Sequence, residues 1–145
     1  MPKFVTSQAS LSQRNEIADE SLGNRFDALN EAIIEAESRL HSMRPVCSVW
    51  FKYKSEYMPN GPSRTYSIGF AKYNGKWRIV HCVDDEDAYP EGAPVFPLTD
   101  RPIEERVYAA AHIPELYQLI VTGKEEFIAK VNETISLLNS FTRKD

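Results

Sequence analysis

Aromatic and basic residues on two predicted strands are the part of this sequence best suited to chemistry. Alternate side chains of a strand share one face, so segments 46–54 and 76–83 would each present a polar face. The side chains expected there are Trp50, Lys52, Lys54 and Arg78. An indole can stack on a flat group, and cations can pair with an anion. The pattern predicts a surface that binds a flat or extended anionic partner.

The strand expected between these two, 64–73, would leave a shallow trough on the same face. It offers only Ser67, Gly69 and Ala71 there, and small residues permit close approach of a ligand. Two simpler explanations stand beside this one. The open face of an antiparallel sheet is normally polar, with lysine a common choice, and the proline-rich segment 55–63 is able to cover Trp50.

His81 falls on the other, apolar face of its strand. We expect a half-buried histidine with one hydrogen-bond partner; the alternative is a pocket residue beneath a covering helix. Cys82 follows it directly, and neighbours on a strand point to opposite faces, so the two cannot form a nucleophile and base pair.

Candidate metal ligands are scattered rather than clustered. Glu37 and His41 share a helical face, and His112 has only Glu105 and Glu115 within reach. A metal site needs three or four converging groups, so we expect no metal.

The remaining reactive groups also lack a catalytic pattern. Cys47 and Cys82 lack C-x-x-C spacing and are expected to be buried small hydrophobic residues. The acidic run 84–87 lacks the ligand spacing of a calcium loop. No phosphate-binding glycine motif or hydrolase motif is present. The sequence therefore predicts no catalytic residues and no cofactor.

Composition restricts the class of protein. The chain has 145 residues, 42% of them hydrophobic, and a net charge of −4. That charge argues against general nucleic-acid binding, although residues 46–83 carry six basic side chains and one acidic one. With two cysteines, no signal peptide and no apolar run long enough for a membrane, we expect a soluble, cytoplasmic protein.

A long helix is expected near the N-terminus, after a flexible tail at residues 1–11. From Leu22 to Met43, apolar residues recur at alternating spacings of four and three, which is a heptad seam. Pro45 ends the helix. About 30 residues of helix exceed what a small sheet can cover, so the seam also predicts a homodimer.

A three-stranded antiparallel meander follows. Asn74-Gly75 is the preferred sequence for a two-residue hairpin turn. The turn sets Phe70 opposite Ile79 and Ile68 opposite His81, which places the apolar positions on one face.

An acidic, proline-rich loop is expected over 84–101, with helical pattern resuming near Pro102. Pro114 would kink that helix or start a new one, Thr122-Gly123 would end it, and a last helix would span 124–141. The prediction is a single α+β domain, its C-terminal helices packed on one sheet face.

No family signature assigns a function. The first hypothesis is a non-enzymatic interaction or adaptor protein that acts as a homodimer. It would bind a macromolecular partner through the basic sheet face or through the acidic loop. The second is a binder of a small anionic, nucleotide-like ligand, held on that face or near His81. An enzyme ranks last.

Overall fold

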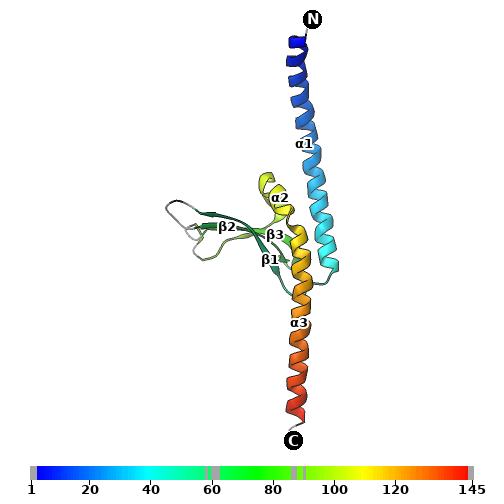
Figure 1. The fold of residues 1–145 in the computed structure, drawn as a ribbon, viewed down its shortest axis with the longest axis vertical. Coiled ribbons are helices and arrows are strands. Elements are labelled where there is room, and N and C mark those ends of the chain that lie inside the picture. The colour runs from blue at the N-terminus through cyan, green and yellow to red at the C-terminus, as the bar shows by residue number, and fades with distance from the viewer. Residues whose placement is uncertain (1–2, 58, 60–62, 86–87, 90, 144–145) are drawn as a thin grey trace.

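The computed structural model describes residues 3–57, 59, 63–85, 88–89 and 91–143. Along the chain these form helix α1 (Lys3–Ser42), strands β1 (Val49–Tyr57), β2 (Ser63–Tyr73), β3 (Lys76–Asp85) and β4 (Val95–Pro97), the 3-10 turn η1 (Leu98–Asp100), and helices α2 (Ile103–Ala110) and α3 (Ile113–Thr142). The sheet lies to one side of the two long helices (Figure 1). The α+β class is as predicted.

The hairpin at the centre of the sheet has the predicted register. β2 and β3 pair antiparallel, with Phe70 opposite Ile79 and Ile68 opposite His81. Asn74 and Gly75 both have positive φ, 51° and 81°, as a type I′ turn requires. The turn therefore places the apolar side chains of both strands on one face.

The sheet has four strands rather than three. Val95–Pro97, predicted as loop, pairs antiparallel with Val80–Cys82. Three residues are too few to show an alternating pattern, and proline is tolerated because β4 is an edge strand. Residues 86–87 of the acidic run lie outside the described residues, so an interaction through that loop stays a prediction.

The first strand starts later than predicted and contains a bulge. β1 begins at Val49, so Cys47 lies in the preceding turn and is exposed, which overturns its predicted burial. Lys52 pairs with Ser67, but Lys54 pairs with Tyr66, so one extra residue, Tyr53, is accommodated between them. A bulge of this kind shifts the alternation of side chains beyond it.

The core lies between the apolar sheet face and the helices. Ile68, Phe70 and Ile79 are fully buried there. They form one cluster with buried residues of the remaining elements, namely Ile33, Leu40, Val49, Leu98, Ala109, Leu116 and Ile120. The seam of α1 thus packs largely on its own sheet, while Leu22 at its start stays half exposed.

An acidic side chain of α1 completes the edge of β3. The Glu37 carboxylate accepts hydrogen bonds from the Ile79 backbone N–H and from Arg78 Nε, both at 2.9 Å. β4 pairs only with Val80–Cys82, so Glu37 takes the place of a neighbouring strand at Ile79.

Both long helices continue further than predicted. α1 begins at Lys3, so the predicted tail is wrong from that residue onward; no glycine or proline interrupts it before Gly23, and extending an established helix costs little. α3 passes through Thr122-Gly123 without a break. A glycine costs about 1 kcal/mol in a helix, which is too little to end one that tertiary packing holds.

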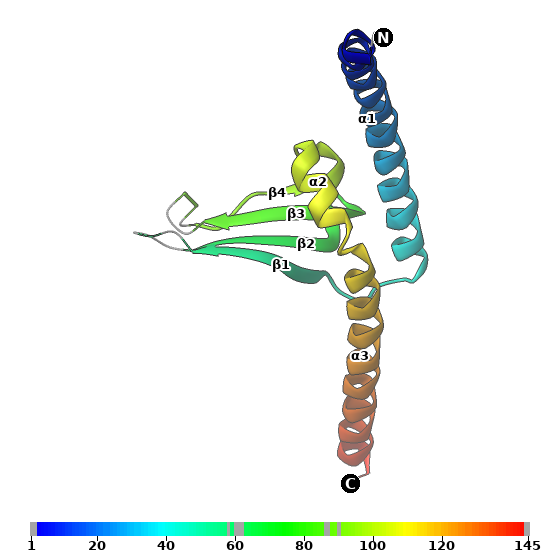
Figure 2. The ribbon, with the colours of Figure 1, turned by 45° about the horizontal axis from the view of Figure 1, so that its top comes forward.

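The two helices leave the body in opposite directions. In both views the N-terminal part of α1 and the C-terminal part of α3 extend beyond the sheet (Figures 1 and 2). Residues 11–25 and 125–143 are all exposed. No helix among the described residues is long and apolar enough to cross a membrane.

Replacing Glu37 tests its role at the sheet edge. Glu37→Ala leaves the Ile79 N–H without an acceptor and Arg78 without its ion-pair partner, so we expect a loss of about 1–3 kcal/mol in the free energy of unfolding. Urea denaturation measures it. Glu35→Ala, an exposed acid on the same helix, is the matched control and should change stability by less than about 0.5 kcal/mol. If the two substitutions lowered stability equally, Glu37 would have no special role at the sheet edge.

Candidate functional site

The four residues of the predicted basic surface have different surroundings in the structure. Trp50 does lie away from the core and is 40% exposed, and Lys52 is exposed. The trough beside them is not open, however. A Cβ added at Gly69 would come within 2.6 Å of the Trp50 ring, so the indole itself lies over Gly69.

The other two predicted binding residues have different neighbours. Lys54 is on the opposite face, because the bulge at Tyr53 reverses the alternation, and its ammonium lies 5.1 Å from the centre of the Tyr66 ring. Arg78 is bonded to Glu37 and to Thr99. The prediction of one face formed by all four residues is therefore wrong for Lys54. The register keeps Arg78 on the face of Trp50, but its guanidinium is already paired, so Trp50 and Lys52 alone remain unpaired there among the described residues.

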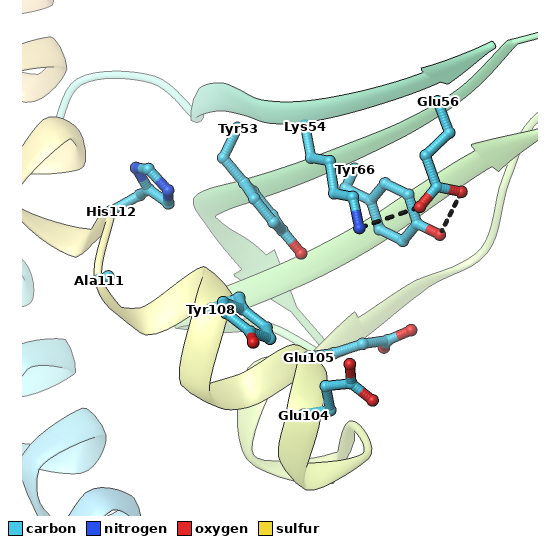
Figure 3. A pocket seen from close by; sticks show the side chains of 9 residues that line it. All are labelled: Tyr53, Lys54, Glu56, Tyr66, Glu104, Glu105, Tyr108, Ala111 and His112. Atoms are coloured by element: carbon cyan, nitrogen blue, oxygen red, sulfur yellow. Dashed lines mark hydrogen bonds and ion pairs between the residues drawn. The ribbon is translucent and has the colours of Figure 1, made fainter.

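The clearest hollow lies on the other side of the sheet, between β1, β2 and α2 (Figure 3). Its volume is about 580 Å³, within the range of small-molecule sites. Four side chains come from the strands and five from the helical segment. The lining consists of Tyr53, Lys54, Glu56, Tyr66, Glu104, Glu105, Tyr108, Ala111 and His112.

A chain of polar groups lies behind this pocket. The Tyr53 hydroxyl is 2.6 Å from His81 Nε2, and His81 Nδ1 is 3.8 Å from a Glu105 carboxylate oxygen. Arg101 Nε donates a hydrogen bond to the same oxygen at 2.9 Å, and Arg101 Nη2 forms an ion pair with it at 2.9 Å. A carboxylate only accepts hydrogen bonds, so the tautomer protonated at Nδ1 fits best, with Tyr53 donating to Nε2.

Burial keeps both members of the Tyr53–His81 pair neutral. His81 is fully buried, deeper than the half-burial predicted, and has the one expected hydrogen-bond partner. Burial lowers the pKa of His81 and outweighs the opposite effect of Glu105. Burial, followed by the Glu105 charge, raises the pKa of Tyr53 to about 12.

A second group of charges forms the outer wall. The Lys54 ammonium is 2.9 Å from a Glu56 carboxylate oxygen, and the Tyr66 hydroxyl donates to the other oxygen at 3.3 Å. The hydrogen bond between Lys54 and Glu56 raises the pKa of Lys54 and lowers that of Glu56. On the inner side, His112 stacks on Tyr53 with ring centres 5.3 Å apart.

The scattered candidate metal ligands are not brought together. Glu37 is engaged at the sheet edge, and His112 packs between the rings of Phe51 and Tyr53. Among the described residues there is no cluster of three or more His, Cys, Asp or Glu suited to a metal. Cys82 is partly buried, and burial raises the pKa of its thiol, which disfavours the thiolate.

Sequence reasoning missed most of the pocket. Alternation along the strands predicts that Tyr53 and Tyr66 lie on the apolar face without a binding role, and no motif marks Glu104 or Tyr108. Only the packing of α2 over the sheet brings them together. The one available signal was the density of tyrosine and charge in residues 53–57.

Comparison with known proteins does not add a function. No protein family, curated protein or solved structure matches this chain.

The burial of His81 predicts a pH-dependent stability. Below the pKa of about 6.5 expected in the unfolded chain, unfolding takes up a proton that the native histidine does not bind. Stability should therefore fall as the pH drops from 7.5 to 5.5, by at most about 1.4 kcal/mol per pH unit. Chemical denaturation at several pH values measures this, with His81→Gln as a variant that cannot titrate. Identical slopes for the two proteins would show that His81 does not cause the effect.

Proposed function

We propose that this protein is a non-enzymatic interaction module that acts as a homodimer, with a second copy bound along the C-terminal half of α3. One observation carries the proposal. That half of α3 has a wide apolar stripe; residues 125–143 are all exposed, and in both views this part of the helix extends beyond the sheet and the other helices (Figures 1 and 2).

The stripe is large for a protein surface. Its side chains are 40–75% exposed: Phe127, Ile128, Val131, Ile135, Leu138 and Phe141. Two of them are phenylalanines, and burying one phenylalanine side chain removes roughly 150–250 Å² of surface from water. Together the six expose on the order of 600 Å², the upper end of what an ordinary monomer leaves in water. A standard interface buries about 800 Å² per partner, so the stripe would supply most of one side.

The spacing of the stripe suits another helix. Ile128, Val131, Ile135 and Leu138 alternate at three and four residues, the heptad pattern of helix pairing. Phe127 and Phe141 widen it on one side, as in helices that face the core of a bundle. The segment 125–142 would extend about 27 Å, enough for two and a half heptads of contact.

A second copy of the chain fits this stripe in the antiparallel direction. An antiparallel two-fold pair centred on Glu133 sets Ile128 opposite the partner copy's Leu138 and brings Arg143 near the acids Glu125 and Glu126 of the other helix. A parallel pair would instead place those acids beside their own copies, which is unfavourable. The antiparallel arrangement also keeps the sheets and core helices of the two negatively charged copies apart.

This dimer differs from the one expected from sequence. The heptad seam predicted to pair was that of α1, but Ile33 and Leu40 of that seam are buried in their own core. Only Leu22 remains half exposed. The pairing surface therefore moves from the first helix to the last.

The second hypothesis, a small anionic ligand, has less support. Near His81 the pocket presents three carboxylates and one ammonium, which is unfavourable for an anion. On the outer face, Trp50 and Lys52 remain available for such a ligand, without Lys54 and Arg78.

Charged substitutions in the stripe should dissociate the dimer. Ile135→Glu with Leu138→Glu buries two carboxylates in the pair, and we expect at least a hundredfold weaker association, since an uncompensated buried charge costs several kcal/mol. Light scattering after size-exclusion chromatography gives the mass. Ser136→Glu with Ser140→Glu adds the same charge to residues outside the stripe and should leave the dimer intact. A wild-type chain that is monomeric at 100 μM overturns the proposal.

Cross-linking distinguishes the two orientations. In a background of Cys47→Ser and Cys82→Ser, the double substitution Ile128→Cys with Leu138→Cys should form an intermolecular disulfide. Each single substitution should not, because in the antiparallel pair identical positions lie about 15 Å apart. Cross-linking by either single variant would indicate a parallel pair.

A further inference from the structure

We infer that the pocket between β1, β2 and α2 binds an organic cation, an ammonium or guanidinium group carried by a small amine or by a lysine or arginine side chain. This inference goes beyond the proposed dimer and uses residues of a single chain.

The charges of the pocket favour a cation. Three carboxylates line it, Glu56, Glu104 and Glu105, against the single ammonium of Lys54. Glu56 forms an ion pair with Lys54, and Glu105 forms one with Arg101, which does not itself line the pocket. Glu104 is exposed and has no hydrogen bond or ion pair with any described residue. One carboxylate at the mouth is thus left for a ligand.

The aromatic side chains add a second attraction. Tyr66 and Tyr108 stand on opposite sides of the hollow, one on β2 and the other on α2 (Figure 3). Cations bind over aromatic faces, and more strongly where water is partly excluded. The protein already shows the pairing, because the Lys54 ammonium lies over the Tyr66 ring while bonded to Glu56. Tyr108, which is 64% exposed, and Glu104 likewise offer an aromatic ring and a carboxylate, and no described cation is paired with that carboxylate.

The interior of the pocket is held in place by buried groups. His81 is fully buried, and its two nitrogens face the two lining residues Tyr53 and Glu105. His81 Nδ1 makes no hydrogen bond to any described residue, and a Glu105 carboxylate oxygen lies 3.8 Å from it. In the tautomer protonated at Nδ1, the Tyr53 hydroxyl donates its hydrogen bond to His81 Nε2, so the hydroxyl oxygen can only accept from a ligand. The wall thus presents fixed acceptors, and preorganised acceptors cost little entropy on binding.

The inference is tested with a matched pair of probes. N-acetyl-arginine amide carries the guanidinium, and N-acetyl-citrulline amide has nearly the same shape without the charge. In a titration followed by amide NMR, the arginine probe should shift signals of residues 53–56, 66 and 104–112 with saturation in the millimolar range. The citrulline probe should bind at least tenfold more weakly. Equal shifts with both probes, or no shift with either at 20 mM, overturn the inference.

Two substitutions locate the site. Glu104→Gln and Tyr108→Ala change exposed residues and should each weaken the arginine probe about tenfold. Glu115→Gln removes the same charge from an exposed position in the first turn of α3, outside the pocket, and should leave the affinity unchanged. Equal weakening by Glu104→Gln and Glu115→Gln would show a general charge effect and contradict the site.

Two further titrations identify the source of the cation and test for binding of an anion. A glycine-serine peptide with one central arginine that binds at least tenfold more tightly than the amide indicates a protein-borne side chain. Equal or weaker binding indicates a free small amine. Inorganic phosphate should cause no shifts at the pocket; phosphate binding there more tightly than the arginine probe overturns the inference.

Discussion

The burial of one apolar face of the β2–β3 hairpin is the constraint from which the rest of this structure follows. That face is covered by α1, α2 and α3, and its three central side chains are fully removed from water. Four strands span only about 15 Å across, whereas helices of 40 and 30 residues extend for about 60 and 45 Å. Helices so long cross a small sheet and must continue past it. The exposed ends are therefore a geometric consequence of how the core is covered.

The bulge at Tyr53 has the largest effect on surface chemistry. Before the bulge, alternation places Trp50 and Lys52 on the outer face; after it, Lys54 and Glu56 turn toward α2. A regular strand would have made a basic outer surface. The observed strand divides those cations and contributes to an acidic, aromatic pocket. One extra residue thus changes which charges each face of the sheet presents.

The pocket and the apolar stripe are separate surfaces, and the chain runs directly from one into the helix that carries the other. His112, which stacks on Tyr53, immediately precedes α3. The first turns of α3 are fixed in the core by Leu116 and Ile120, and its last turns carry the stripe. The direction in which the stripe projects is therefore set by the packing that also closes the inner side of the pocket. This arrangement allows both surfaces to be occupied at once.

The sequence by itself determined the features that depend on near neighbours. Asn74-Gly75 predicted the hairpin and its register, and alternation identified Ile68, Phe70 and Ile79 as core. Pro102 marked the start of α2, and of the two outcomes predicted for Pro114, a kink or a new helix, the structure has the new helix. Tertiary structure decided the rest. Gly123 remained helical, Val95–Pro97 became a strand, and Tyr53 became a bulge, because packing energies from distant segments outweigh local preferences of about 1 kcal/mol. The pocket belongs to this second group, since its strand wall ends at Tyr66 and its helical wall begins at Glu104, and only the docking of α2 places the two together.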